Sequence, residues 1–432
     1  MELYSTKKIS PNVSIGEAVL KGLPDDNGLY MPVQIPELPK SFFDGIEKMT
    51  FQDIGFTVSQ ALLGKSVDDQ SLRKILAEAF DFETPLVKIK EGFSVLELFH
   101  GPTAAFKDFG ARFMSRLMRY FLQQTNQEIN ILVATSGDTG SAVGHGFLGV
   151  EGIRVTILYP KGKVSDIQEK QLTTIGGNVS ALEIDGTFDD CQRLVKSAFL
   201  DEELSSKLNL TSANSINIAR LIPQSFYYFH AYAQLKSDGK PVVFSVPSGN
   251  FGNLCGGLIA KKMGLPIAHF IASTNVNDIV PEYLRSGVFH ARPSIETISN
   301  AMDVGNPSNF PRMLALHDWE YDKIKNEISA FSFDDNETKQ AMREVFNECD
   351  YTLCPHTAVA YLGLKNWLQE QHEAFNGVLL STAHPAKFID VVEETLKAKI
   401  LIPERLQEAL SKEKVAQPMS GKFDDFKSWL LG

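Results

Sequence analysis

The chain has 432 residues, enough for two or three domains, and its 43% hydrophobic and 22% charged residues are ordinary for a globular protein. The formal net charge of −11 argues against nucleic acids and anionic membranes as partners, because both are negatively charged. The chain has no apolar run of about 18 residues that would cross a membrane and no signal-like start, and its four cysteines lack metal-ligand spacing. We therefore expect a cytoplasmic protein with free thiols and no metal site.

The first part of the chain is rich in turn signals. Prolines and a turn at 24–28 interrupt residues 24–39, and helical patterns follow at 50–63 and 69–80. We expect residues 1–90 to form an N-terminal subdomain that caps the rest of the molecule.

From residue 91 onward, predicted strands alternate with predicted helices. The strands are expected at 93–98, 130–134, 153–159 and 178–184, and the helices at 108–124, 142–146, 165–174 and 188–199. This alternation indicates a parallel sheet with crossover helices. We expect residues 91–200 to form a small α/β domain.

The alternation continues from residue 201 to the end, which we expect to form a large α/β domain, 201–432. Its predicted helices are at 218–235, 254–263, 336–348 and 357–371, and its strands at 241–246, 267–272 and 377–380. Residues 274–335 contain four prolines and little periodicity, so we interpret them as an irregular insertion. The last 30 residues are charged and are expected to be helical.

One lysine lies in an unusually apolar stretch just before a predicted helix. Lys107 is flanked by Ala105, Phe106 and Phe109. Desolvation lowers the pKa of a lysine, and a neutral amine can form a Schiff base with an aldehyde. The alternative is a lysine whose ammonium group reaches water from a helix start. The stretch alone leaves both open.

Three loops share a layout in which an apolar strand leads through small polar residues into a helix. They are residues 135–140, 247–253 and 381–385. Loops at the carboxyl ends of parallel strands bind ligands, and helix starts offer unpaired N–H groups. Each loop taken alone is also explained as a plain turn or helix cap.

These loops and a fourth segment differ in the ligand groups they suit. Residues 247–253 suit a phosphate held by backbone N–H groups, and the lack of a Walker lysine and of G-x-G-x-x-G argues against ATP and dinucleotides. Residues 135–140 suit a carboxylate, and Thr382 offers a hydroxyl. Asn214, Ser215 and Arg220 surround a helix start and suit a second anion. Together with Lys107, these groups match the aldehyde, phosphate and ring nitrogen of pyridoxal phosphate.

The same motifs resemble those of the threonine synthase family. They are HGPTAAFKD at 100–108, SGDTG at 136–140, NSINIAR at 214–220, PSGNFGN at 247–253 and TAHPAKF at 382–388. The resemblance spans nearly the whole chain and keeps the family's order. It implies a tryptophan synthase β-like (fold type II) architecture, with two parallel-sheet, helix-flanked domains, an N-terminal capping subdomain and pyridoxal 5'-phosphate as coenzyme.

The resemblance also implies a role for each motif residue. Lys107 would carry the Schiff base and then move protons, and Thr382 would bind the pyridine nitrogen. The coenzyme phosphate would lie on Gly249, Asn250, Phe251, Gly252 and Asn253. The substrate would contact Ser136, Gly137, Thr139, Asn214, Ser215 and Arg220. Asp138 would contact the coenzyme ring, although many fold type II relatives have asparagine at its position.

The activity implied is conversion of O-phospho-L-homoserine and water to L-threonine and phosphate, by γ-elimination followed by β-addition of water. We expect a monomer, with a dimer left open. One alternative is a phospholyase or dehydratase that releases a 2-oxo acid and ammonia, which uses the same residues until the last steps. Lys107 argues against a second alternative, a non-catalytic protein on this scaffold. The second anion segment argues against a serine- or cysteine-synthesising relative.

Overall fold

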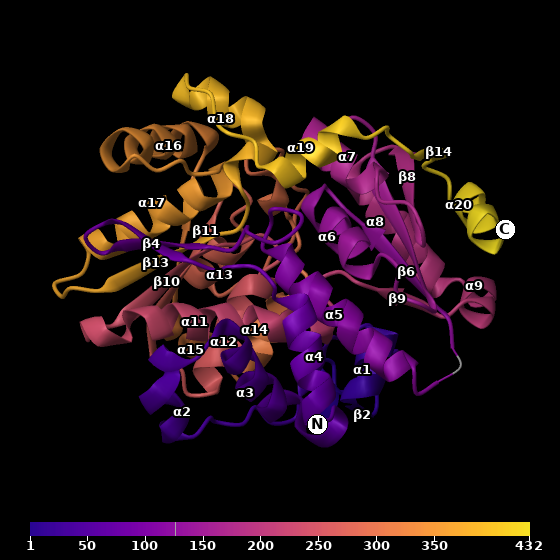
Figure 1. Cartoon of the computed structure of the whole chain (residues 1–432), viewed down its shortest axis with the longest axis horizontal. Coiled ribbons are helices and arrows are strands. Elements are labelled where there is room, and N and C mark those ends of the chain that lie inside the picture. Colours follow the sequence, from indigo (N-terminus) through magenta and orange to yellow (C-terminus); the bar gives the residue numbers. More distant parts are fainter. Residues whose placement is uncertain (126) are drawn as a thin grey trace.

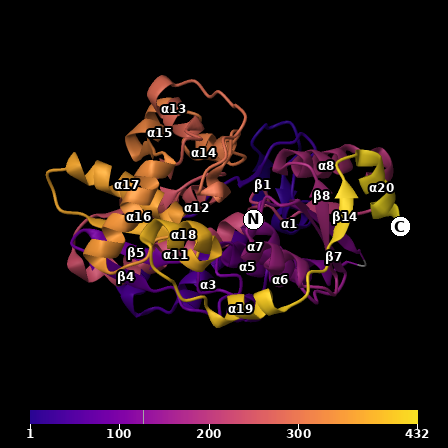
Figure 2. The same ribbon diagram turned by 90° about the horizontal axis from the view of Figure 1, so that it is seen from above.

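The computed structural model describes residues 1–125 and 127–432, and two mostly parallel β-sheets form its framework (Figure 1). Seen from above, β4 and β5 of one sheet lie on one side of the molecule and β7, β8 and β14 of the other sheet lie on the opposite side (Figure 2). This confirms the predicted α/β class with two parallel-sheet regions. Within the described part of the chain, we find no helix with the length and apolar character needed to cross a membrane.

The larger sheet has six strands in the order β12-β11-β10-β13-β5-β4. They are β4 (Leu86–Lys90), β5 (Phe93–Glu97), β10 (Val242–Pro247), β11 (Ile267–Thr274), β12 (Ile328–Ser332) and β13 (Asn376–Ser381). All neighbours are parallel except the edge pair of β4 and β5. Every residue of β10 and β13 is buried, as expected for parallel strands covered on both faces.

The smaller sheet has five parallel strands in the order β14-β8-β7-β6-β9. They are β6 (Ile129–Ala134), β7 (Ile153–Pro160), β8 (Val179–Asp185), β9 (Leu210–Ser212) and β14 (Gln417–Ser420). Strand β14 comes from the last 30 residues, which are expected from the sequence to be helical. It completes the edge of the sheet beside β8, so the end of the chain returns to a domain begun almost 300 residues earlier.

The chain passes between the two sheets more often than the predicted boundaries at 91–200 and 201–432 allow. Strand β5 belongs to the larger sheet, where it pairs with β13, and β9 and β14 belong to the smaller one. Strand β4 also joins the larger sheet, although it falls within the predicted 1–90 subdomain. The reason is that parallel neighbours are joined by long crossovers, so strands adjacent in space can be distant in sequence.

The segment 274–335, predicted to be an irregular insertion, contains regular elements. They are α13 (Ile279–Ser286), α14 (Phe310–Leu316), α15 (Tyr321–Glu327) and strand β12. Strand β12 forms the edge of the larger sheet, beside β11. The prolines suggested irregular structure, but Pro281 and Pro311 lie in the first turns of α13 and α14, where a missing N–H costs little.

The N-terminal region packs a small sheet and four helices against the rest of the protein. Its strands β1 (Glu2–Ser5), β2 (Val13–Ser14) and β3 (Tyr30–Pro32) are antiparallel, and its helices are α1 (Ile15–Lys21), α2 (Lys40–Gly45), α3 (Phe51–Leu63) and α4 (Asp69–Ala79). Phe51 and Phe80 form aromatic contacts with Phe109 and Phe226 from later in the chain. The region therefore shares one hydrophobic core with both sheets instead of having its own.

The remaining helices flank the two sheets. They are α5 (Lys107–Leu122), α6 (Asp138–Phe147), α7 (Asp166–Thr173), α8 (Phe188–Leu200), α9 (Glu202–Lys207), α10 (Ile218–Leu221), α11 (Phe226–Leu235), α12 (Gly252–Lys262), α16 (Asp335–Cys349), α17 (Pro355–Gln369), α18 (Ile389–Leu396), α19 (Glu404–Ser411) and α20 (Phe423–Leu431). The helix predicted at 218–235 is broken between α10 and α11, because Pro223 lacks an N–H and forces a 3-10 turn.

Candidate active site

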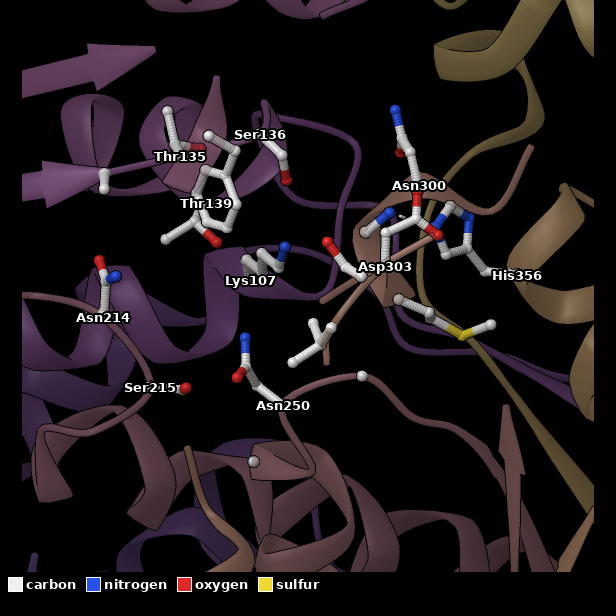
Figure 3. Close-up of a pocket in the computed structure, with 18 of the residues that line it drawn as sticks. Lys107, Thr135, Ser136, Thr139, Asn214, Ser215, Asn250, Asn300, Asp303 and His356 are labelled. Atoms are coloured by element: carbon white, nitrogen blue, oxygen red, sulfur yellow. Dashed lines mark hydrogen bonds between the residues drawn. The ribbon is translucent and has the colours of Figure 1, made fainter. Parts of the chain in front are cut away.

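A cavity of about 460 Å³ lies where strands of both sheets end (Figure 3). The last residues of β6, β7 and β10 line it, and so does Thr382, which directly follows β13. The carboxyl ends of strands are the usual place for ligands in such sheets. The structure brings these predicted site residues to the cavity wall: Lys107, Ser136, Thr139, Asn214, Ser215, Arg220, Gly249, Asn250, Phe251, Gly252, Asn253 and Thr382.

Lys107 is the first residue of α5, and the loop before it is tied to the loop that carries Thr382. The Phe106 N–H donates to the Thr382 carbonyl oxygen at 2.8 Å, and the His384 N–H donates to the Ala104 carbonyl oxygen at 3.0 Å. Ala104 adopts a left-handed conformation with φ of 55°, a strained state for alanine that the surrounding bonds hold in place. Two segments distant in sequence are therefore fixed against each other beside the cavity.

Lys107 is half-buried as a residue, and the pKa of its amine falls to about 8. Burial is the main cause, Arg220 and Lys387 lower the pKa further, and Asp138 opposes them. A lysine with this pKa has a sizeable neutral fraction near neutral pH, so it can act as a nucleophile or a base. The sequence left open whether the Lys107 ammonium group reaches water or whether Lys107 is a desolvated nucleophile. The geometry favours the desolvated nucleophile.

The turn at 249–253 leads from β10 into α12 and leaves no room for side chains at its start. A Cβ on Gly249 would lie 2.8 Å from the Met302 Cα. Phe251 has a left-handed φ of 60° and directly precedes α12, which begins at Gly252. The first N–H groups of a helix have no acceptor within it and lie at the positive end of its dipole. This turn can therefore hold a phosphate by its backbone.

Asn214, Ser215 and Arg220 form a second group of anion donors next to that turn. A Cβ on Gly252 would lie 3.3 Å from the Ser215 Cβ, so the two loops touch. Arg220 is 3% exposed and donates to the Ala213 carbonyl at 2.6 Å, but forms no ion pair with any residue that the structure describes. Burial lowers its pKa to about 10, which leaves the guanidinium charged at neutral pH. Its positive charge is thus available to a bound anion.

Asp138 and Gly137 do not line the cavity. The Asp138 carboxylate pairs with the Lys387 ammonium at 2.9 Å and accepts a bond from the Gln168 amide at 2.9 Å. Burial alone would raise the pKa of Asp138, but Lys387 and Lys107 hold it well below its usual range. Lys387 is fully buried and also donates to the Thr103 carbonyl at 2.8 Å. With its carboxylate engaged in this way, contact of Asp138 with the coenzyme ring stays a prediction.

Several residues of the cavity wall were not found by sequence reasoning. Glu296, Thr297, Asn300 and Asp303 come from the segment interpreted as an insertion, and burial raises the pKa of Asp303 to about 6. Their segment lacks the strand–loop–helix layout that identified the other loops, so only its polar composition could have drawn attention to it.

His356, at the start of α17, is another residue that the sequence did not identify. It is 3% exposed, its Nε2 accepts the Ala301 N–H at 3.2 Å, and burial lowers its pKa to about 4. The ring is therefore neutral at neutral pH. Nothing in the motif that surrounds it distinguishes it from an ordinary core histidine.

The residues at the cavity fit pyridoxal phosphate. Lys107 supplies an amine of lowered pKa for the aldehyde, and the backbone turn at 249–253 suits the phosphate. Thr382 lines the cavity, and its hydroxyl has no hydrogen-bond partner among the residues that the structure describes, so it can bind the ring nitrogen. Each part of the coenzyme therefore has a matching group on the cavity wall.

Comparison with known proteins identifies relatives over the full chain. The family described as "Pyridoxal-phosphate dependent enzyme" matches residues 79–380, "Threonine synthase N terminus" matches residues 2–80, and "Threonine synthase, C-terminal" matches residues 357–429. A threonine synthase of Serratia marcescens is 43% identical over 433 residues, which cover 100% of this chain and 99% of that protein.

Solved structures agree with the sequence comparison. The crystal structure of threonine synthase from Escherichia coli matches with a TM-score of 0.93 and 42% identity over 100% of this chain and 99% of that one. The PLP-bound threonine synthase from Brucella melitensis matches with a TM-score of 0.93 and 33% identity over 100% and 98% of the two chains.

Proposed function

We propose roles for the residues of this cavity from the premise that the chain belongs to the threonine synthase family of pyridoxal-phosphate-dependent enzymes. The enzyme is a lyase that converts O-phospho-L-homoserine and water to L-threonine and phosphate, the last step of threonine biosynthesis. Its coenzyme is pyridoxal 5'-phosphate.

The observation that carries the assignment of roles is that one cavity contains two groups of anion donors. The coenzyme and the substrate each bring a phosphate, so two phosphate sites are needed. We assign the coenzyme phosphate to the backbone turn at 249–253. We assign the substrate phosphate to Asn214, Ser215 and Arg220, because Arg220 is a buried cation with no ion pair among the described residues.

Lys107 holds the coenzyme and later moves protons. When bound, pyridoxal phosphate supplies an aldehyde that joins the substrate amine and a conjugated ring that draws electrons from the substrate's α-carbon. With the coenzyme joined to the substrate, a free Lys107 Nζ would be placed to take the α-proton, for which a pKa of about 8 is suitable. The Thr382 hydroxyl, held beside Lys107 by the bond between their loops, would orient the ring through its nitrogen.

The remaining residues bind and orient the substrate. The hydroxyls of Ser136 and Thr139 lie at the start of α6, where helix N–H groups also favour a carboxylate. Arg220, with Asn214 and Ser215, keeps its donors on the phosphate while negative charge builds up there as the bond to the γ-carbon breaks. Both ends of the substrate are thereby fixed until the phosphate leaves, and the carboxylate contacts still hold the remaining carbon chain when water adds at the β-carbon.

Product analysis tests this function against the phospholyase alternative. Holoenzyme incubated with O-phospho-L-homoserine should release threonine and phosphate in equal amounts. Release of 2-oxobutyrate and ammonia with the phosphate would support the alternative, because that enzyme adds no water at the β-carbon. The variant Lys107→Ala, assayed in parallel, controls for phosphate released without enzyme catalysis.

We place the enzyme in the cytoplasm and expect it to act as a monomer. All four cysteines are free in the structure, which is typical of proteins in a reducing compartment. Light scattering during size-exclusion chromatography should give the mass of one chain, and a doubled mass would show that the dimer left open by the sequence is the correct state.

A further inference from the structure

The residues that lead into α14 contact the turn assigned to the coenzyme phosphate. Ser308 donates its N–H at 3.1 Å and its hydroxyl at 2.9 Å to the Asn250 Oδ1. The Asn309 N–H donates to the Asn250 carbonyl oxygen at 3.3 Å. Asn250 is thereby fixed through both its side chain and its backbone.

The same start of α14 also contacts the loop assigned to the substrate phosphate. The Asn309 Nδ2 donates to the Ser215 Oγ at 3.0 Å. The Arg312 guanidinium donates to the carbonyl oxygens of Ser215 at 3.0 Å and Ile216 at 2.6 Å, and to the Asn309 Oδ1 at 2.7 Å. Figure 3 shows Ser215 and Asn250 on neighbouring loops beside Lys107.

Burial of the charged Arg312 guanidinium costs free energy. Arg312 is fully buried, and it forms no ion pair with the residues at 1–125 and 127–432. Its acceptors are neutral oxygens, the fourth being the Tyr30 carbonyl at 3.2 Å. The two terminal nitrogens of the guanidinium donate to these oxygens, whereas the Arg312 Nε has no partner among the described residues, so the planar fork ties the positions of these carbonyl groups together. Lysine could not replace it, because one ammonium group cannot match the same spread of acceptors.

We propose that Asn309 and Arg312 act as positioning residues that set the separation between the two phosphate loops, and thereby select the length of the substrate. The proposal rests on the function proposed above. In a substrate joined to the coenzyme, the separation of the two phosphates depends on the number of carbons before the substrate's phosphate. A fixed separation of loops therefore accepts a phosphate on the γ-carbon and disfavours one a carbon nearer or farther.

The test measures inhibition of the holoenzyme by a series of 2-amino-ω-phosphono acids whose chains differ by one carbon. The unaltered enzyme should prefer one length sharply. In Asn309→Ala and Arg312→Lys, the preference for that length over the next should fall at least about tenfold, since misplacement by about 1 Å can cost about 10²-fold. Ser308→Ala, which keeps its N–H bond to Asn250, should weaken coenzyme binding while changing the length preference less than threefold.

The outcomes distinguish a positioning role of the substituted residues from a purely structural one. Loss of packing would weaken all phosphonates in parallel and lower the melting temperature, so an unchanged length preference in both Asn309→Ala and Arg312→Lys would overturn the proposal. If either variant does not fold, the other still decides. If the unaltered holoenzyme binds none of the phosphonates, it is the proposed function that fails, because no substrate phosphate site would then exist.

Discussion

Two fully buried cations, Lys387 and Arg312, lie near different parts of the cavity, and their charged groups have different kinds of partner. Lys387 pairs with the Asp138 carboxylate, whereas Arg312 bonds only to neutral oxygens. We call the region around Lys107, Asp138, Thr382 and Lys387 the lysine end of the cavity. The region around Asn214, Ser215, Arg220, Asn250 and Arg312 is the phosphate end.

The difference matches the ligands expected at each end. At the lysine end, internal pairing of charge leaves Lys107 as the group that titrates near neutral pH. At the phosphate end, Arg220 and Arg312 lack a carboxylate partner in the described chain, so their positive electrostatic potential can stabilise bound anions. Changes at the lysine end should therefore affect chemistry and stability, and changes at the phosphate end should affect substrate binding.

The largest effect is expected from Lys107→Ala at the lysine end. Threonine formation should fall at least about 10³-fold, because both the covalent anchor and the base are lost. Coenzyme binding should weaken but persist through the turn at 249–253, as measured by equilibrium dialysis. Retained threonine formation would show that another group takes the α-proton, and the assignment of the lysine end would be wrong.

Breaking the buried pair should destabilise the fold. Lys387→Met removes the ion-pair partner of the buried Asp138 carboxylate and leaves it the neutral Gln168 amide, which should cost about 3–5 kcal/mol of unfolding free energy in urea titrations. Adding Asp138→Asn to this variant should recover most of the loss, because the uncompensated charge is removed. Lys163→Met, at an exposed lysine of the same cavity, is the control and should cost less than about 1 kcal/mol. A double variant as unstable as Lys387→Met would contradict the pairing.

At the phosphate end, Arg220→Ala should impair substrate binding while sparing the coenzyme. Loss of a buried charge-assisted contact costs about 2 kcal/mol or more, so KM for O-phospho-L-homoserine should rise at least about thirtyfold. Coenzyme affinity, followed by absorbance, should change less than threefold. Equal losses of both affinities would mean that the two phosphate sites are not separate.

The smallest effect is a pH dependence at the lysine end. Because the pKa of Lys107 lies near 8 instead of 10.5, the neutral fraction of its amine increases about tenfold per pH unit below 8 and then levels off. The rate of coenzyme capture by coenzyme-free protein should follow the same curve. Since the Asp138 charge raises the Lys107 pKa, Asp138→Asn should move the plateau to lower pH. A rate that still climbs tenfold per unit above pH 9 would rule out the lowered pKa.

The sequence predicted the parts of the site that have a local pattern. The loops at 135–140, 247–253 and 381–385 each follow an apolar strand, so their meeting at one cavity could be expected from parallel-sheet geometry. Lys107 was identified by its apolar neighbours, although only the packing of the whole chain gives it a lowered pKa.

The residues that the sequence did not reveal act through partners distant in the chain. Lys387 is significant because it reaches Asp138, and Arg312 because it reaches Ser215, Ile216 and Tyr30. No local periodicity encodes such contacts. The exchange of strands between the two sheets was missed for the same reason, since β5 meets β13 only after the chain has folded.

The most direct test of two separate phosphate sites is a crystal structure of the holoenzyme with a phosphonate analogue of O-phospho-L-homoserine. We predict two distinct phosphorus positions. One should lie on the backbone turn at 249–253, and the other should lie within hydrogen-bond reach of Asn214, Ser215 and Arg220. A second phosphorus bound away from Arg220, or both phosphorus atoms on the same loop, would contradict the assignment of the phosphate end.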